Sequence, residues 1–185
     1  MTKKISLTPL IFILTVAFSW GQSNSDYILW SSTRKLSVDD FTIKTKQLET
    51  TPSFAQFTLD YQVNGFDFLT KDFNKRVHNY FIKGASWIDT TTNVQQSIIY
   101  QQTLFDICEI YTRQFRKALK ENRKKISKGT AIAEELNKQF MSAFAKRRVN
   151  YDRETKLSID DTKQKEWENQ IQKELTELAN YAYDK

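Results

Sequence analysis

The chain is poor in the residues that usually build disulfides, metal sites and loops. Its 185 residues include one cysteine, one histidine, two prolines and four glycines. Because Cys108 is alone, an intrachain disulfide is excluded and stability has to come from the core. Because His78 is alone, the usual histidine-based zinc site is excluded, since a hydrolytic zinc needs about three protein ligands. Scarce glycine and proline argue against a low-complexity chain.

The N-terminus predicts export. Lys3 and Lys4 precede an apolar run over 7–18 that is too short and too interrupted for a transmembrane span. Small residues at Ser19 and Gly21 suit cleavage, so we expect a signal peptide over 1–21 and one domain over 22–185. The mature chain would be periplasmic or extracellular and without a transmembrane span; an uncleaved membrane anchor is the alternative.

The first half of the chain has the period of β-strands. Residues 27–30 form a short apolar strand candidate, and 54–63 alternate between apolar and polar side chains. Asn64-Gly65 predicts a hairpin turn into 66–68. Further strands are expected over 76–82 and 86–88, separated by a break at Gly84, although a helix over 68–82 stays open.

The second half has the period of helices. Apolar residues recur at threes and fours, which predicts helices over 93–126, 130–150 and 161–182. Gly129 suits a C-terminal cap, and Asp161 to Gln164 resemble a capping box. We therefore predict an α+β fold, in which a small antiparallel sheet from 27–90 packs on three helices.

Two basic stretches, 116–128 and 146–148, account for much of the positive charge. They could meet phosphate or an anionic membrane surface, but their placement at helix ends explains them without a ligand. No nucleic-acid motif accompanies them, so nucleic acid is not an expected partner.

Several ordered segments carry a resemblance to a known family. They are Ile28 to Trp30, Arg34 to Phe41, Ala55 to Tyr61, Ser86-Trp87-Ile88, Ile98 to Leu119, Asn150 to Thr155, and Gln164 with Trp167. In this order they resemble a family of predicted secreted zinc-dependent proteases of bacteria, which are zincin-like and otherwise of unknown function. The resemblance covers nearly the whole mature chain and implies a protease-like fold.

The chain departs from that family where its chemistry would be. The family's two helical zinc ligands fall at Tyr100 and Leu104, its general base at Gln101 and its further histidine at Leu157. Tyrosine is a poor zinc ligand, leucine is none, and glutamine cannot take a proton at neutral pH. The resemblance therefore implies a pseudoenzyme with no metal, no cofactor and no catalytic residues, whose partner would be a peptide or an envelope protein.

The remnant of the cleft would comprise Asp106, Glu109, Arg113, Tyr151, Asp152 and Glu154. We expect Asp106 and Glu109 to pair with Arg113 or to cap a neighbouring turn, and Asp152 and Glu154 to order the loop that presented the last ligand.

Four other functions stay open. A live hydrolase could use Asp106, Glu109 or Glu154 as atypical metal ligands, and the four carboxylates with Asp152 could hold a hard cation. Cys108 and His78 could form a thiol dyad, although a mid-helix cysteine in an apolar stripe is more often a core residue. An envelope protein that shares only the fold would bind a partner instead.

Overall fold

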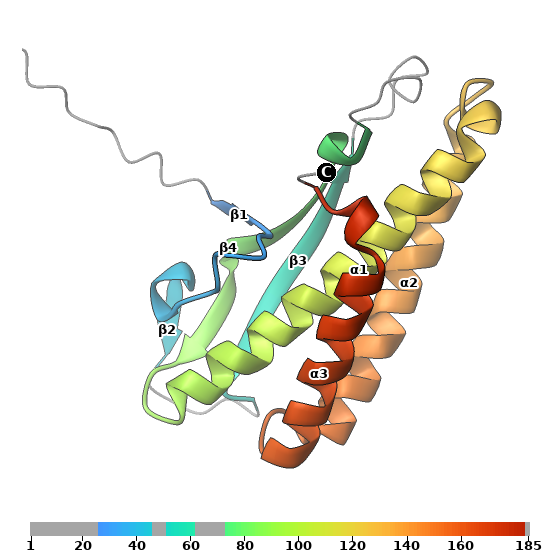
Figure 1. Cartoon of the computed structure of the whole chain (residues 1–185). Coiled ribbons are helices and arrows are strands. Elements are labelled where there is room, and N and C mark those ends of the chain that lie inside the picture. The colour runs from blue at the N-terminus through green and yellow to red at the C-terminus, as the bar shows by residue number, and fades with distance from the viewer. Residues whose placement is uncertain (1–25, 46–50, 62–72, 184–185) are drawn as a thin grey trace, which may run out of the picture.

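The computed structural model describes residues 26–45, 51–61 and 73–183. The expected signal peptide, the Asn64-Gly65 turn and the 66–68 strand lie outside these residues. The chain runs through β1 (Tyr27–Leu29), η1 (Val38–Asp40), β2 (Ile43–Thr45), β3 (Ser53–Tyr61), η3 (Phe73–Arg76), β4 (Val77–Asp89), α1 (Val94–Ile126), α2 (Ala131–Glu154), α3 (Asp161–Glu177) and η4 (Ala179–Tyr181), where η marks a 3-10 helix. The predicted α+β order, sheet first and three helices after, is confirmed (Figure 1).

The sheet is built around β4. Strand β3 pairs with it antiparallel over nearly its whole length. On the other side β1 pairs antiparallel with the first part of β4, and β2 pairs parallel with its last three residues. The sheet is therefore mostly antiparallel with one short parallel strand, and β2 is a strand that the sequence pattern did not reveal.

Strand β4 continues through Gly84, where we expected a break. Between the pairs Phe54–Trp87 and Gln56–Ile82 the register shifts, so four residues of β4 face one residue of β3. The Ser86 hydroxyl stabilises this bulge, because it donates to the Ile82 carbonyl at 2.6 Å and accepts from the Gln56 backbone N–H at 3.1 Å. The alternative prediction of a helix over 68–82 is likewise wrong for the described residues 73–82, which form the 3-10 helix η3 and the start of β4.

Helix α1 covers one face of the sheet, and α2 and α3 pack on α1 (Figure 1). The buried residues of α1 recur at intervals of three and four, as the predicted amphipathic stripe requires. Phe105 of α1 stacks on Phe57 of β3 with ring centroids 5.2 Å apart, and Phe81 of β4 is fully buried beside them. The core thus lies between α1 and the sheet.

The helix ends differ from expectation by a few residues. Helix α2 continues to Glu154, and α3 ends at Glu177 before a 3-10 turn. The N-cap of α3 is Asp160, whose carboxylate accepts from the Lys163 amide at 3.1 Å. Gly129 is not left-handed, so the expected glycine cap is wrong. Within the described ranges, none of the helices combines the length and apolar character needed to cross a bilayer.

Candidate functional site

Tyr100 and Leu104 lie one turn apart on α1 and are both buried in the main core. The Tyr100 ring stacks on the ring of Tyr151 from α2, with centroids 4.9 Å apart and planes 17° apart. Its hydroxyl donates a hydrogen bond to the Asp152 carboxylate. Burial and this hydrogen bond raise the pKa of Tyr100 far above its ordinary value, so the phenol keeps its proton.

Gln101 points away from that pair, toward the sheet. Its side-chain amide donates to the Ser53 hydroxyl at 2.9 Å, and both residues are buried. Within the part of the chain that the structure describes, the Gln101 side-chain oxygen is buried without a hydrogen-bond partner. The side chain at the expected position of the general base is therefore held against β3.

Leu157 lies in the tight connection between α2 and α3. Lys156, Leu157 and Ser158 have φ values of 51°, 57° and 78°, a run of three non-glycine residues in the left-handed region. The Leu157 amide donates to the Asp152 carbonyl at 2.9 Å, and its side chain packs on the main core. Asp152 therefore contacts both Tyr100 and Leu157, two of the positions that the resemblance assigns to metal ligands.

The segment from Asn150 to Glu154 is the last turn of α2 and not a loop. In the loop that follows, the Leu157 amide donates to the Asp152 backbone carbonyl, so Asp152 contacts that loop through its main chain. Asp152 accepts the hydrogen bond from Tyr100, whereas Glu154 accepts one from the Trp167 indole at 2.9 Å. The two carboxylates serve different contacts, because residues two apart on a helix point in different directions.

Tyr151 connects the two outer helices to α1. Its hydroxyl donates to the Gln164 side-chain oxygen at 2.6 Å, and the Gln164 amide donates to Thr103 and Glu168. Burial raises the pKa of Tyr151, so this hydroxyl remains a donor. The side chains around the expected metal position thus hydrogen-bond to one another.

Glu109 lies in a buried ion network with two arginines. Its carboxylate accepts from Arg113 at 3.0 Å and from Arg116 at 2.8 Å, and all three side chains are almost wholly buried. Arg113 also donates to the Leu175 carbonyl, and Arg116 donates to the carbonyls of Val77 and Tyr181. The expected pair with Arg113 is confirmed for Glu109, and the network joins α1 to the sheet and to the C-terminal segment.

Asp106 has other partners than expected. Its Oδ1 accepts from the Trp30 indole at 2.7 Å and from the Gln102 amide at 2.8 Å, while Lys35 lies 3.8 Å from Oδ2. The expected pair with Arg113 is therefore wrong for Asp106. Burial raises the pKa of this carboxyl, although the nearby Lys35 ammonium opposes the shift.

The residues at the four degenerate positions do not fit zinc. Tyr100 holds its proton, Gln101 is turned to the sheet, and Leu104 and Leu157 have no donor atom. Among the described residues, no three histidine, cysteine, aspartate or glutamate side chains gather into a ligand set. Asp106, Glu109, Asp152 and Glu154 each make separate contacts and form no common cation site.

Cys108 and His78 are not in contact. Cys108 is fully buried in the main core, and burial raises the pKa of its thiol. His78 packs against the rings of Tyr80 and Tyr183. The structure therefore does not bring the two groups of the hypothetical thiol dyad together.

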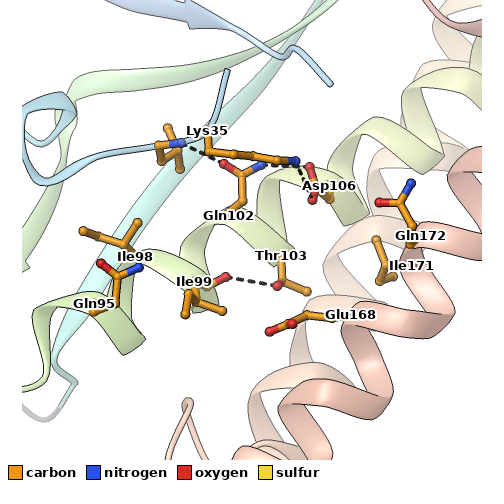
Figure 2. A pocket seen from close by; sticks show the side chains of 11 residues that line it. Lys35, Gln95, Ile98, Ile99, Gln102, Thr103, Asp106, Glu168, Ile171 and Gln172 are labelled. Atoms are coloured by element: carbon orange, nitrogen blue, oxygen red, sulfur yellow. Dashed lines mark hydrogen bonds and ion pairs between the residues drawn. The ribbon is translucent and has the colours of Figure 1, made fainter. Parts of the chain in front are cut away.

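A cavity of about 340 Å³ opens between α1, α3 and the segment before η1 (Figure 2). It is lined by Lys35, Leu36, Gln95, Ile98, Ile99, Gln102, Thr103, Asp106, Glu168, Ile171 and Gln172. Of these residues only Asp106 was singled out from the sequence. The signal that could have found the cavity is the polar spacing of Gln95, Gln102 and Asp106 along a face of α1.

Comparisons with protein-family models, curated proteins and solved structures find no match for this chain. The resemblance to secreted zinc-dependent proteases therefore stays a prediction that rests on the residues quoted above.

Proposed function

We propose that the protein is an exported, non-catalytic homologue of a secreted zinc-dependent protease and that it acts by binding a partner. The observation that carries the proposal is the contact of Tyr100 with Tyr151 and Asp152. These side chains lie around the positions at which the family would hold its metal. They contact one another through a ring stack and a hydrogen bond.

The packing of the leucines supports the same proposal. Leu104 is fully buried and Leu157 packs against the same core cluster. A fully buried leucine side chain contributes on the order of 1.5–3 kcal/mol to stability, whereas a histidine there would bury a polar ring. Leucine at these two positions therefore favours a packed core over a metal site, which supports the proposal.

The alternative of a live hydrolase with atypical ligands finds less support. Glu109 is enclosed by two arginines, Glu154 accepts from Trp167, and Asp106 accepts from Trp30. These carboxylates contact different neighbours, so a shared metal would have to break existing contacts. The proposal of a binding protein is also compatible with a purely structural relationship to proteases, in which only the fold is common.

The proposal is tested by restoring the ligands. We expect the parent to bind no zinc after mild dialysis, and the variant Tyr100→His/Leu104→His/Leu157→His to bind zinc at least about tenfold more tightly than a control. The control, Ile99→His/Thr103→His/Leu157→His, moves the same helical spacing to the neighbouring face of α1. The measurement is zinc titration by calorimetry with elemental mass spectrometry.

The restored variant should also be less stable than the parent without metal, because the buried Leu104 and the partly buried Leu157 are lost. If it does not fold, Tyr100→His/Leu157→His keeps Leu104 and uses Asp152 as the third ligand. Near-stoichiometric zinc in the parent, with peptidase activity that a chelator abolishes, would overturn the non-catalytic proposal. Equal zinc affinity of restored and control variants would overturn the assignment of these positions.

A further inference from the structure

The cavity between α1 and α3 has a carboxylate oxygen with an incomplete set of hydrogen bonds. Asp106 Oδ1 accepts two short hydrogen bonds, from Trp30 and Gln102. Among the described residues, its Oδ2 is approached only by the Lys35 ammonium, at 3.8 Å, which is too long for a hydrogen bond. The Asp106 side chain is 13% exposed, so this oxygen is mostly removed from water but still reached from the cavity.

A second carboxylate lines the same cavity in a similar state. Glu168 of α3 is half-buried, and its Oε1 accepts from the Gln164 amide at 2.9 Å. Within the described ranges no hydrogen bond reaches its Oε2. Figure 2 shows Asp106 and Glu168 on the walls contributed by α1 and α3, with Lys35 extended across the top. Two carboxylates against one lysine give the cavity a net negative charge in a chain whose formal net charge is +6.

The remaining walls are suited to a short aliphatic chain. Leu36, Ile98, Ile99 and Ile171 supply apolar surface, and the amides of Gln95 and Gln172 lie among the polar lining. At about 340 Å³ the cavity is at the small end of the range for ligand pockets. An occupant therefore needs a compact cationic donor on a slim apolar body.

We propose that this cavity binds a primary alkylammonium group, whose N–H donors reach Asp106 Oδ2 while its methylenes lie on the isoleucines and the Glu168 carboxylate adds negative charge to the same cavity. Lys35 serves as an internal placeholder. Its side chain is 53% exposed and its ion pair with Asp106 is loose, so an incoming ammonium can displace it into solvent. Burial raises the pKa of Asp106, and a ligand cation would favour its ionised form.

This inference does not depend on descent from a zinc protease, because none of its residues occupies the four degenerate positions. Lysine side chains and free diamines share the same ammonium chemistry. Nα-acetyl-lysine amide and cadaverine are therefore separate probes, and n-butylammonium is the common reference. Tetramethylammonium, which has no N–H donor, and neutral n-butanol are the negative controls.

The test follows the Trp30 indole N–H in ¹H–¹⁵N NMR spectra, since that group donates to Asp106 Oδ1. We expect n-butylammonium to shift the resonance saturably and to bind up to about fourfold more tightly for each methylene added from ethyl to butyl. Asp106→Asn should weaken binding at least tenfold. Glu168→Gln should weaken it severalfold and keeps the proposal testable if Asp106→Asn does not fold.

Lys35→Met is the discriminating variant, because removal of the competing ammonium should tighten binding severalfold. Matched controls are Lys44→Met, whose ammonium pairs with Asp39, and Glu166→Gln, an exposed α3 carboxylate outside the cavity. Both should bind as the parent does. An unchanged or weakened affinity of Lys35→Met for n-butylammonium, or equal shifts with tetramethylammonium, would overturn the proposal. Neither result bears on the zinc titration that tests the proposed function.

Discussion

Tyr100 takes part in two different contacts of the core. It gives the core an aromatic ring that stacks on Tyr151, and it gives Asp152 a hydrogen-bond donor. Its neighbour in sequence, Gln101, faces the sheet instead, because successive helical residues are about 100° apart. Two adjacent positions of the resemblance therefore have quite different environments.

The hydrogen bond from Tyr100 to Asp152 should be measurable as a coupling energy. We expect Tyr100→Phe to lower the free energy of unfolding by about 1–2 kcal/mol, because a partly buried carboxylate loses its donor. In a double-mutant cycle with Asp152→Asn, measured by urea denaturation, the coupling should be at least about 0.5 kcal/mol. Strictly additive losses would show that the contact is not formed in solution.

The buried Asp106 should make stability depend on pH. Burial raises the pKa of Asp106 in the folded protein above the ordinary value of 3.8. The protonated carboxyl therefore stabilises the fold fully when the pH is below 3.8, and this contribution is lost as the pH rises through the folded pKa. Asp106→Asn cannot ionise, so its stability relative to the parent should increase from pH 3.5 to 7. Each pKa unit of difference is worth about 1.4 kcal/mol.

The measurement is urea denaturation of parent and variant across this pH range. Asp39→Asn is the matched control, since that side chain is 85% exposed. A stability difference between Asp106→Asn and the parent that stays constant or falls with pH would contradict the expected sign.

At the scale of elements, strong periodicity was a reliable guide and local breaks were not. The stripe of α1 and the alternation of β3 predicted both elements, because each period puts apolar side chains on one face. Gly84 did not end β4, since the Ser86 hydroxyl satisfies the backbone inside the bulge. Strand β2 has two exposed residues of three, so it has no apolar pattern to detect.

The connection between α2 and α3 carries backbone strain that glycine should relieve. Lys156 has φ 51°, and the left-handed region costs a side-chain-bearing residue about 1–2 kcal/mol. Glycine relieves this strain but also gives the unfolded chain more conformational freedom, which offsets part of the gain. Lys156→Gly should therefore raise the free energy of unfolding by about 0.5 kcal/mol.

The matched control for this turn is Lys165→Gly, at an exposed interior position of α3. Glycine there should lower stability by about 1 kcal/mol, so the two substitutions have opposite signs. Thermal or urea denaturation of both variants makes the comparison. An equal loss in Lys156→Gly would show that the turn does not require the left-handed backbone.

At the scale of the whole molecule, α1 is the element that unites the layers. It contacts β3, β4, α2 and α3, and its Arg116 donates to carbonyls of β4 and of η4. The buried ion network of Glu109, Arg113 and Arg116 adds contacts that cannot be lost singly without leaving an unpaired buried charge. We therefore expect one cooperative unfolding transition.

Fluorine NMR of protein labelled with 5-fluorotryptophan can test this expectation. Trp30, Trp87 and Trp167 report on the segment after β1, on β4 and on α3. Their native resonances should disappear at the same urea concentration, at which helical circular dichroism is also half lost. Loss of the Trp167 resonance at clearly lower urea would mean that α3 unfolds separately from the sheet.

The sequence by itself determined the class of fold and much of its core. Alternation and helical stripes predicted a sheet followed by three helices, because burial of one face requires those periods. The presence of one histidine and one cysteine also determined that the chain lacks the usual histidine or cysteine sets of zinc ligands.

Tertiary structure alone decided which groups meet. Asp106 and Glu109 looked equivalent beside Arg113, yet Asp106 pairs with Trp30 and Glu109 with two arginines. The cavity likewise joins Lys35, Asp106 and Glu168, which are far apart in sequence. Helical spacing gives neighbours within one helix, but contacts between elements depend on how the helices and the sheet pack, and no local pattern records that packing.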